Sequence, residues 1–144
     1  MGNQMLMVVL ALALFSTIML NMYNLVLDDA KVVYNNILYT QGQKIADRYF
    51  QQIESELLGS SPVIEFDDVH TNFNGLQTTE TVGNNIYNVN LTTSYADSLG
   101  STSSPDSSYI RVDVRMNCVS AAGDTLYIGT QSNPFSKVFF EIGM

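Results

Sequence analysis

The chain has 144 residues, with six basic and 14 acidic side chains and a formal net charge of −8 at pH 7. The basic residues are scattered singly, which argues against nucleic-acid binding by phosphate neutralisation. A single cysteine, Cys118, excludes an intrachain disulfide. No group of residues has the spacing of a catalytic constellation, so we expect no enzyme, no cofactor and no metal centre.

Residues 5–27 form the longest apolar stretch, and no charged residue precedes Asp28. A helix that is apolar on every side needs apolar surroundings on every side, which are either lipid or copies of itself. About 20 apolar residues span the hydrocarbon core of a bilayer, so the stretch is long enough for a membrane anchor. Its clear polar residues are Ser16, Thr17, Asn21 and Asn24.

Three interpretations of residues 1–27 differ in the fate of this helix. A cleaved signal peptide has a basic start and a small-residue cleavage site, but the first basic residue here is Lys31. An ordinary transmembrane anchor is the second interpretation. The third is a helix that starts in a membrane and ends packed among copies of itself in a polymer. In that polymer the packed side chains would be Met5, Val8, Val9, Leu12, Leu14, Phe15, Ile18, Leu20 and Leu25.

The helical pattern continues beyond Asp28 without a break, which a simple membrane anchor does not require. From residue 45 onward, apolar residues recur every four positions, as in a helix that buries one side. The residues expected to pack this side against the remainder of the chain are Ile45, Tyr49, Phe50, Ile53 and Leu57.

Gly59 and Pro62 together form a helix stop signal. We therefore expect one helix of roughly 55 residues, apolar on all sides over residues 1–27 and amphipathic over residues 28–59. Gly42 is the only glycine well inside it. We expect a local weakness there, because glycine costs about 1 kcal/mol in a helix interior.

After the stop signal the apolar spacing changes to alternation, which predicts a small antiparallel sheet of four to five strands within residues 62–144. The clearest expected strands are residues 87–95 and 109–118. Such a sheet has one apolar face that needs a cover. The sequence thus predicts an α+β fold in which the sheet wraps the amphipathic half of the long helix.

Three shorter strands are also expected. Leu126 and Ile128 mark one of them, and residues 63–66 are expected to form a short edge strand. The last strand is marked by Val138, Phe140 and Ile142 on its apolar side, with Lys137, Phe139 and Glu141 on the other side.

Three single residues carry weaker signals. Asn90 begins an Asn-Leu-Thr glycosylation pattern on the expected outer side of a strand, and the alternative is a solvated asparagine. His70 has no nucleophile or metal-ligand partner at useful spacing, and we expect it in a surface loop. Cys118 alternates with core residues, so we expect it to be buried.

The order of these elements resembles the type IV pilin-like family, which includes pilins and pseudopilins. The resemblance rests mainly on residues 2–10, where a glycine is followed by polar and then apolar residues. This arrangement is similar to the site at which prepilin peptidase cuts after glycine, which would place the cleavage between Gly2 and Asn3. Residues 136–142 are also similar to the last strand of minor pilins and pseudopilins.

The chain departs from the commonest bacterial pilins in several respects. Those proteins have glutamate at the fifth mature position, where this chain has Met5 or Met7, depending on which residue is first. The proline near position 22 and the disulfide-closed C-terminal loop are also missing from the sequence. The resemblance therefore implies a divergent branch of the family.

The resemblance implies a structural subunit of an extracellular helical filament, with a role in adhesion, motility or a related process. Its expected partners are identical subunits, the cytoplasmic membrane before assembly, prepilin peptidase and the pilus assembly machinery. Two alternatives are a pseudopilin of a type II-like secretion system and a single-span membrane-anchored surface protein with a small binding domain.

Overall fold

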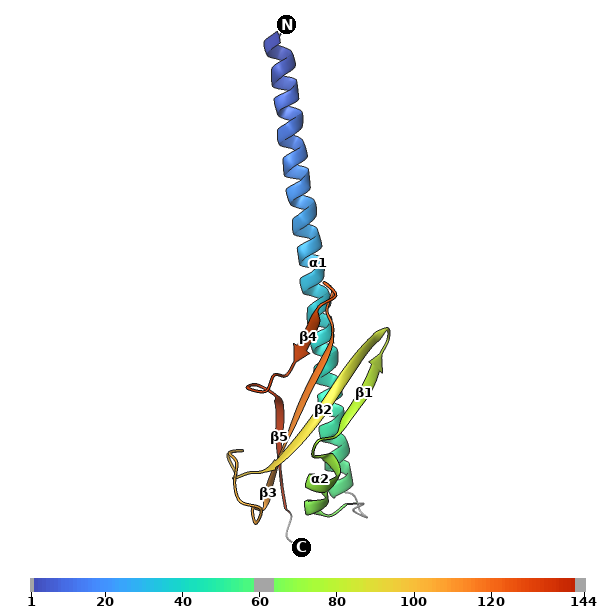
Figure 1. Cartoon of the computed structure of the whole chain (residues 1–144), viewed down its shortest axis with the longest axis vertical. Helices are drawn as coiled ribbons and strands as arrows, with labels where there is room; N and C mark the ends of the chain where they lie inside the picture. Colours follow the sequence, from blue (N-terminus) through green and yellow to red (C-terminus); the bar gives the residue numbers. More distant parts are fainter. Residues whose placement is uncertain (1, 59–63, 142–144) are drawn as a thin grey trace.

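The computed structural model of the chain describes residues 2–58 and 64–141. A long N-terminal helix, α1 (Gly2–Leu58), packs against a five-stranded antiparallel sheet, which confirms the predicted α+β fold. Figure 1 shows that the sheet lies beside only the C-terminal half of α1, whereas the N-terminal half stands clear of all other elements. A helix of this length spans about 85 Å.

Helix α1 continues without interruption through Gly42, where the sequence predicts a weakness. This glycine is buried, and a Cβ atom built on it would lie 2.8 Å from Cγ2 of Ile128 and 3.1 Å from Sδ of Met116. The missing side chain therefore lets α1 approach β3 (Tyr109–Val119) and β4 (Thr125–Ile128) closely. The predicted stop signal, Gly59 and Pro62, lies outside the described residues.

The sheet is built around β3. Strand β2 (Asn85–Tyr95) pairs along one side of it, and β1 (Gln77–Val82) extends the sheet beyond β2. On the other side, β4 pairs with residues 116–119 of β3, and β5 (Phe135–Phe140) pairs with residues 109–114. Every pairing is antiparallel.

The core lies between α1 and one face of this sheet. Every second residue of β3 faces the helix, from Ile110 to Cys118, and the residues between them are partly exposed. Strand β2 alternates in the same way, with Tyr87 and Leu91 fully buried. The helix contributes Leu38, Ile45, Ala46, Tyr49, Phe50 and Ile53 to this core.

The edge strand predicted at residues 63–66 is wrong, and residue 63 lies outside the described residues. A second helix, α2 (Phe66–Phe73), begins there instead. Its first turn is stabilised by Asp68, whose carboxylate accepts a hydrogen bond from the backbone N–H of Glu65 at 3.0 Å. His70 belongs to this helix and not to a loop.

Strand β1 has no counterpart in the sequence prediction. Its residues are QTTETV, so apolar alternation is missing, and its exposed side chains alternate with partly buried ones. Its position is set by the ladder to β2, in which Thr79 lies opposite Asn88. Threonine suits a half-buried pleated surface, which explains why a polar edge strand forms here.

The sequence prediction assigns the wrong side of β5 to the core. Phe139 is 6% exposed and Phe140 is 61% exposed, whereas the sequence places Val138 and Phe140 on the buried side. Phe139 lies opposite Ile110 of β3, which faces the helix, so both residues share the inner face. Ile142 lies outside the described residues.

Candidate functional site

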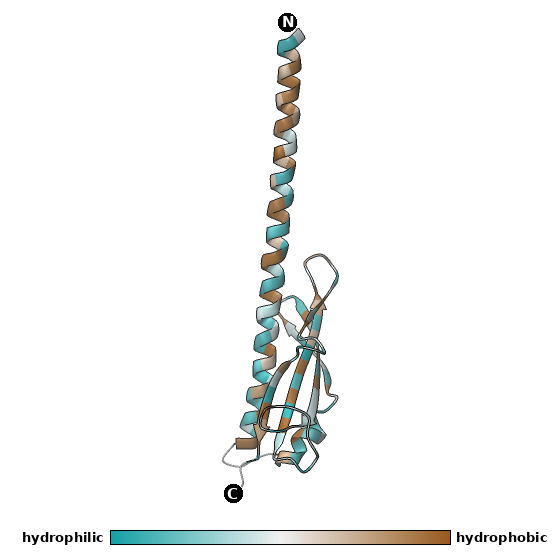
Figure 2. Cartoon of the chain, turned by 90° about the vertical axis from the view of Figure 1, so that its left-hand side faces the viewer, coloured by the Kyte–Doolittle hydropathy of each residue, from teal (hydrophilic) through white to brown (hydrophobic). Residues whose placement is uncertain are grey.

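The N-terminal half of α1, residues 2–33 and called the free half below, carries most of the exposed large hydrophobic side chains of the described chain. Figure 2 shows that hydrophobic residues predominate over the turns of this free half near the N-terminus, and that hydrophilic segments recur between them nearer the sheet. Its most apolar 18-residue window has a mean hydropathy of 2.3, and none of that window is buried. By length and composition this helix is compatible with a membrane span.

The side chains predicted to pack between copies all lie on this free half, and they are between 56% and 74% exposed. Gly2 and Asn3, the predicted peptidase site, form the first turn of α1 and are also exposed. The side chains predicted to pack against the sheet lie at the other end. Ile45, Tyr49, Phe50 and Ile53 are at most 8% exposed, and Leu57 packs at the margin of the core.

The exposed apolar surface does not end at the first charged residues. Val33 and Ile37 follow Asp28 and Lys31, and they are 58% and 48% exposed. They line a shallow groove along α1 together with Asn36, Thr40, Gln41 and Lys44. The spacing of residues 33, 37, 40 and 44 places them on one side of α1. The buried positions 38, 42, 45 and 49 lie on a different side of the same helix.

Polar contacts fasten the sheet to α1 near the point where the free half begins. Tyr34 Oη donates a hydrogen bond to Oδ1 of Asn85 at 2.7 Å, and Tyr87 Oη donates to Oε1 of Gln41 at 2.6 Å. Burial raises the pKa of Tyr87 to about 12, so its phenol is neutral at physiological pH and acts as the donor. These contacts hold the free half in a defined direction relative to the sheet.

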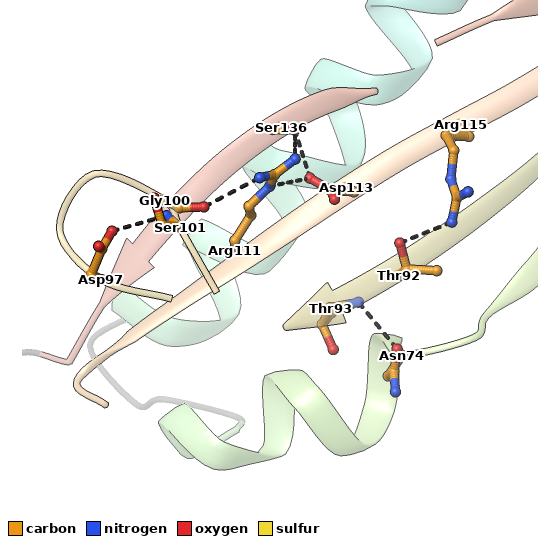
Figure 3. A network of polar contacts seen from close by, with 10 residues as sticks. All are labelled: Asn74, Thr92, Thr93, Asp97, Gly100, Ser101, Arg111, Asp113, Arg115 and Ser136. Atoms are coloured by element: carbon orange, nitrogen blue, oxygen red, sulfur yellow. Dashed lines mark hydrogen bonds and ion pairs between the residues drawn. The ribbon is translucent and has the colours of Figure 1, made fainter. Parts of the chain in front are cut away.

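The outer face of the sheet carries a network of polar contacts (Figure 3). Nε of Arg111 lies 2.7 Å from Oδ1 of Asp113, and Ser136 Oγ donates to the same oxygen at 2.5 Å. Arg111 Nη1 also donates to the carbonyl oxygen of Gly100 at 3.2 Å. The network joins β3, β5 and the loop before β3, so its polar groups are occupied by structural contacts.

Asn90 lies in the middle of β2, between Gln77 of β1 and Arg115 of β3. Its Oδ1 is buried and has no hydrogen-bond partner among residues 2–58 and 64–141. The hydroxyl of Thr92, which completes the glycosylation pattern, accepts a hydrogen bond from Nη2 of Arg115 at 3.2 Å. Glycosylation of Asn90 stays a prediction.

His70 is held by one hydrogen bond and one contact between rings. Its Nδ1 lies 2.7 Å from Oγ1 of Thr93, and its ring lies 5.0 Å from that of Tyr95, centroid to centroid. In the described part of the chain, no group of three or more histidine, cysteine, aspartate or glutamate side chains is placed to hold a metal ion.

Comparison of the chain with protein-family models, with curated proteins and with solved structures finds no match.

Proposed function

We propose that the chain is a type IV pilin-like subunit, which α1 anchors in the cytoplasmic membrane until identical copies assemble into a helical filament at the cell surface. The observation that carries this proposal is the exposed apolar surface at Val33 and Ile37. A membrane anchor accounts for the apolar surface up to Leu27. The apolar surface beyond Asp28 favours contact with a protein, and α1 of an identical copy would offer exposed apolar side chains of its own.

The energetics of transfer favour a route from lipid to protein. At about 25 cal/mol per Å² of apolar surface, exposing the free half of α1 to water would cost tens of kcal/mol. The helix must therefore move directly from the bilayer into a bundle of apolar helices. Close packing between copies would hold that bundle together, as it does between membrane helices.

The geometry of a single subunit is compatible with an open polymer. The sheet lies beside one end of α1 and leaves the other end free, so the two ends present different surfaces (Figure 1). A contact between two different surfaces builds a ring if the rotation closes and a helical filament if it does not. The proposed filament is the open case. In such a filament the sheets would form the outer layer, and their polar outer faces would meet the surroundings.

Replacing Ile37 with aspartate tests the proposal. This residue lies beyond the apolar span, so Ile37→Asp should leave membrane insertion intact. A charge in the groove should nevertheless reduce fibre yield at least tenfold, because a buried unpaired carboxylate is costly. Fibres sheared from cells and counted by negative-stain electron microscopy give the yield. Gln43→Asp, which places the same charge at an exposed position outside the groove, is the matched control.

Wild-type chains that remain single molecules in the membrane would overturn the proposal and favour a single-span anchored surface protein. If Ile37→Asp and the wild type give the same fibre yield, the groove is not an assembly surface. Long wild-type fibres at the cell surface also separate a pilus from the short pseudopilus of a secretion system.

A further inference from the structure

Two adjoining open grooves lie on the outer face of the sheet, which is turned away from α1. Each has a volume of about 350 Å³, and Asn88, Asn90 and Asn117 line both of them. The ladder between β2 and β3 brings these amides together, because Asn88 lies opposite Asn117, and Asn90 lies opposite Arg115. Volumes of this size lie at the lower end of the range for small-molecule sites.

The grooves have an unusual charge for this acidic chain. Within the described part of the chain, no acidic side chain lines either groove, although the sequence has 14 of them, and Arg115 is the one basic residue of the linings. Arg115 donates a hydrogen bond to Thr92 (Figure 3). Unlike Arg111, it has no carboxylate within ion-pair distance among residues 2–58 and 64–141. A guanidinium with open donors suits a carboxylate ligand, which it can bind through two parallel hydrogen bonds.

The amides of the grooves also have unused hydrogen-bonding groups. Asn88 Nδ2 donates to Oδ1 of Asn117 at 3.1 Å, which leaves the acceptor of Asn88 and the donors of Asn117 for a ligand. Because Oδ1 of Asn90 is buried without a partner in the described chain, turning this amide toward a ligand would gain a hydrogen bond and lose none there. Amides both donate and accept, which matches hydroxyl groups that also do both.

Tyr127 supplies an apolar surface beside these polar groups. It lies opposite Asn117 in the ladder between β3 and β4, lines one of the grooves, and is 66% exposed. A tyrosine ring can cover the apolar C–H face of a sugar while its hydroxyl stays in water. The grooves therefore combine a cation, several amides and an aromatic ring, which match the carboxylate, the hydroxyls and the C–H face of an acidic sugar.

We infer that the outer face of the sheet binds a carbohydrate that bears carboxylates. Arg115 binds a carboxylate, the three asparagines bind hydroxyl groups, and Tyr127 packs against a sugar ring. An acidic peptide also has carboxylates, but it offers fewer hydroxyls to neighbouring amides. The inference goes beyond the proposed filament and does not depend on it, because every contact comes from one subunit. In a filament the site would be repeated, and multivalency would strengthen binding to a long polysaccharide.

The test titrates the full chain, as single molecules in detergent, with short oligosaccharides of galacturonate, alginate and hyaluronan. The chain is produced in a host that does not glycosylate asparagine, so that Asn90 carries no sugar of its own. Isothermal titration calorimetry should detect binding of at least one of the three. Methyl esterification of its carboxylates should weaken binding by roughly tenfold or more, because charge-assisted hydrogen bonds are lost. Oligoglutamate of similar charge should not bind.

Three variants test whether this face is the site. Arg115→Gln should weaken binding of the oligosaccharide by roughly tenfold or more. Tyr127→Ala should also weaken it, and the exposure of this ring means that its loss should leave the fold intact. Lys31→Gln makes the same charge change on α1, where Lys31 lies beside Asp28, and should bind as the wild type does.

Failure of all three oligosaccharides to bind, or equal binding of the methyl ester, would overturn the inference. Oligoglutamate that binds as tightly as the oligosaccharide would overturn it in favour of an acidic peptide. Unchanged affinity of Arg115→Gln would place the carbohydrate elsewhere, and if that variant does not fold, unchanged affinity of Tyr127→Ala would do the same. None of these measurements requires fibres, so a failure of the proposed filament would be seen separately.

Discussion

Glu80 joins the polar edge strand β1 to the long helix through one carboxylate oxygen. Its Oε1 accepts a hydrogen bond from Tyr49 Oη at 2.6 Å and lies 2.6 Å from Nη2 of Arg48. The hydrogen bonds from Tyr49 and then Arg48 lower the pKa of Glu80 below its ordinary value of 4.5. Burial, followed by the hydrogen bond to Glu80, raises the pKa of Tyr49.

This cluster predicts a specific loss of stability in acid. A carboxyl whose folded-state pKa lies below its unfolded-state pKa stabilises the fold above the unfolded value, and the contribution is lost as the pH falls through the folded value. Glu80→Gln cannot titrate, so its unfolding midpoint should fall less steeply than that of the wild type in acid. Thermal unfolding in detergent between about pH 3 and pH 7 measures the difference.

Asp106→Asn removes one exposed negative charge elsewhere and is the control for the change in net charge. Equal steepness of the wild type and Glu80→Gln would show that ionisation of Glu80 is not linked to stability.

The close contact between α1 and the sheet at Gly42 predicts that a larger side chain at this position destabilises the fold. A side chain at this position would meet Ile128, which is itself fully buried and cannot move aside easily. Gly42→Val should therefore lower the free energy of unfolding by about 1–3 kcal/mol, as overpacking does in other cores. Chemical denaturation measures the change, and Gln43→Val, at the exposed neighbouring position, is the control. Equal stabilities of the two variants would contradict a close approach at Gly42.

At the scale of elements, β5 shows why pattern alone is insufficient near a chain end. Val138, Phe139 and Phe140 are consecutive apolar residues, so either side of the strand has a plausible apolar set. Lys137 lies on the inner face, where its Nζ reaches Oε2 of Glu54 on α1 at 2.9 Å. An ion pair this exposed contributes little stability, but it allows a lysine to occupy an inward position.

The two neighbouring phenylalanines of β5 give a matched pair of variants. Phe139→Ala should lower the free energy of unfolding by about 3 kcal/mol, because Phe139 fills part of the core. Phe140→Ala should change it by less than about 0.5 kcal/mol, because that ring is exposed. Denaturation of the two variants under identical conditions gives the comparison. A larger loss from Phe140→Ala would reverse the assigned inner face.

At the scale of the whole molecule, the two halves of α1 have different surroundings. The C-terminal half buries one side against the sheet, whereas the N-terminal half makes no contact that would shield its apolar side chains within the described chain. The exposed apolar surface of the N-terminal half is the basis for the proposed filament. The filament-yield experiment tests this property.

Local pattern alone predicted the elements whose signal is repeated many times along the chain. These are the long uninterrupted helix, the change from its apolar half to its amphipathic half, and the alternating strands β2 and β3. The residues proposed to pack between copies also follow from sequence, because hydrophobicity is a property of each side chain. A helical or strand period summed over ten or more residues outweighs the exceptions at single positions.

Only the tertiary structure decided features that depend on neighbours far away in the sequence. It showed that Gly42 is a contact point, that polar β1 joins the sheet, and that Phe139 is the inward residue of β5. Ladder pairing and close packing join residues from separate segments, so the period of a single segment has no information about them.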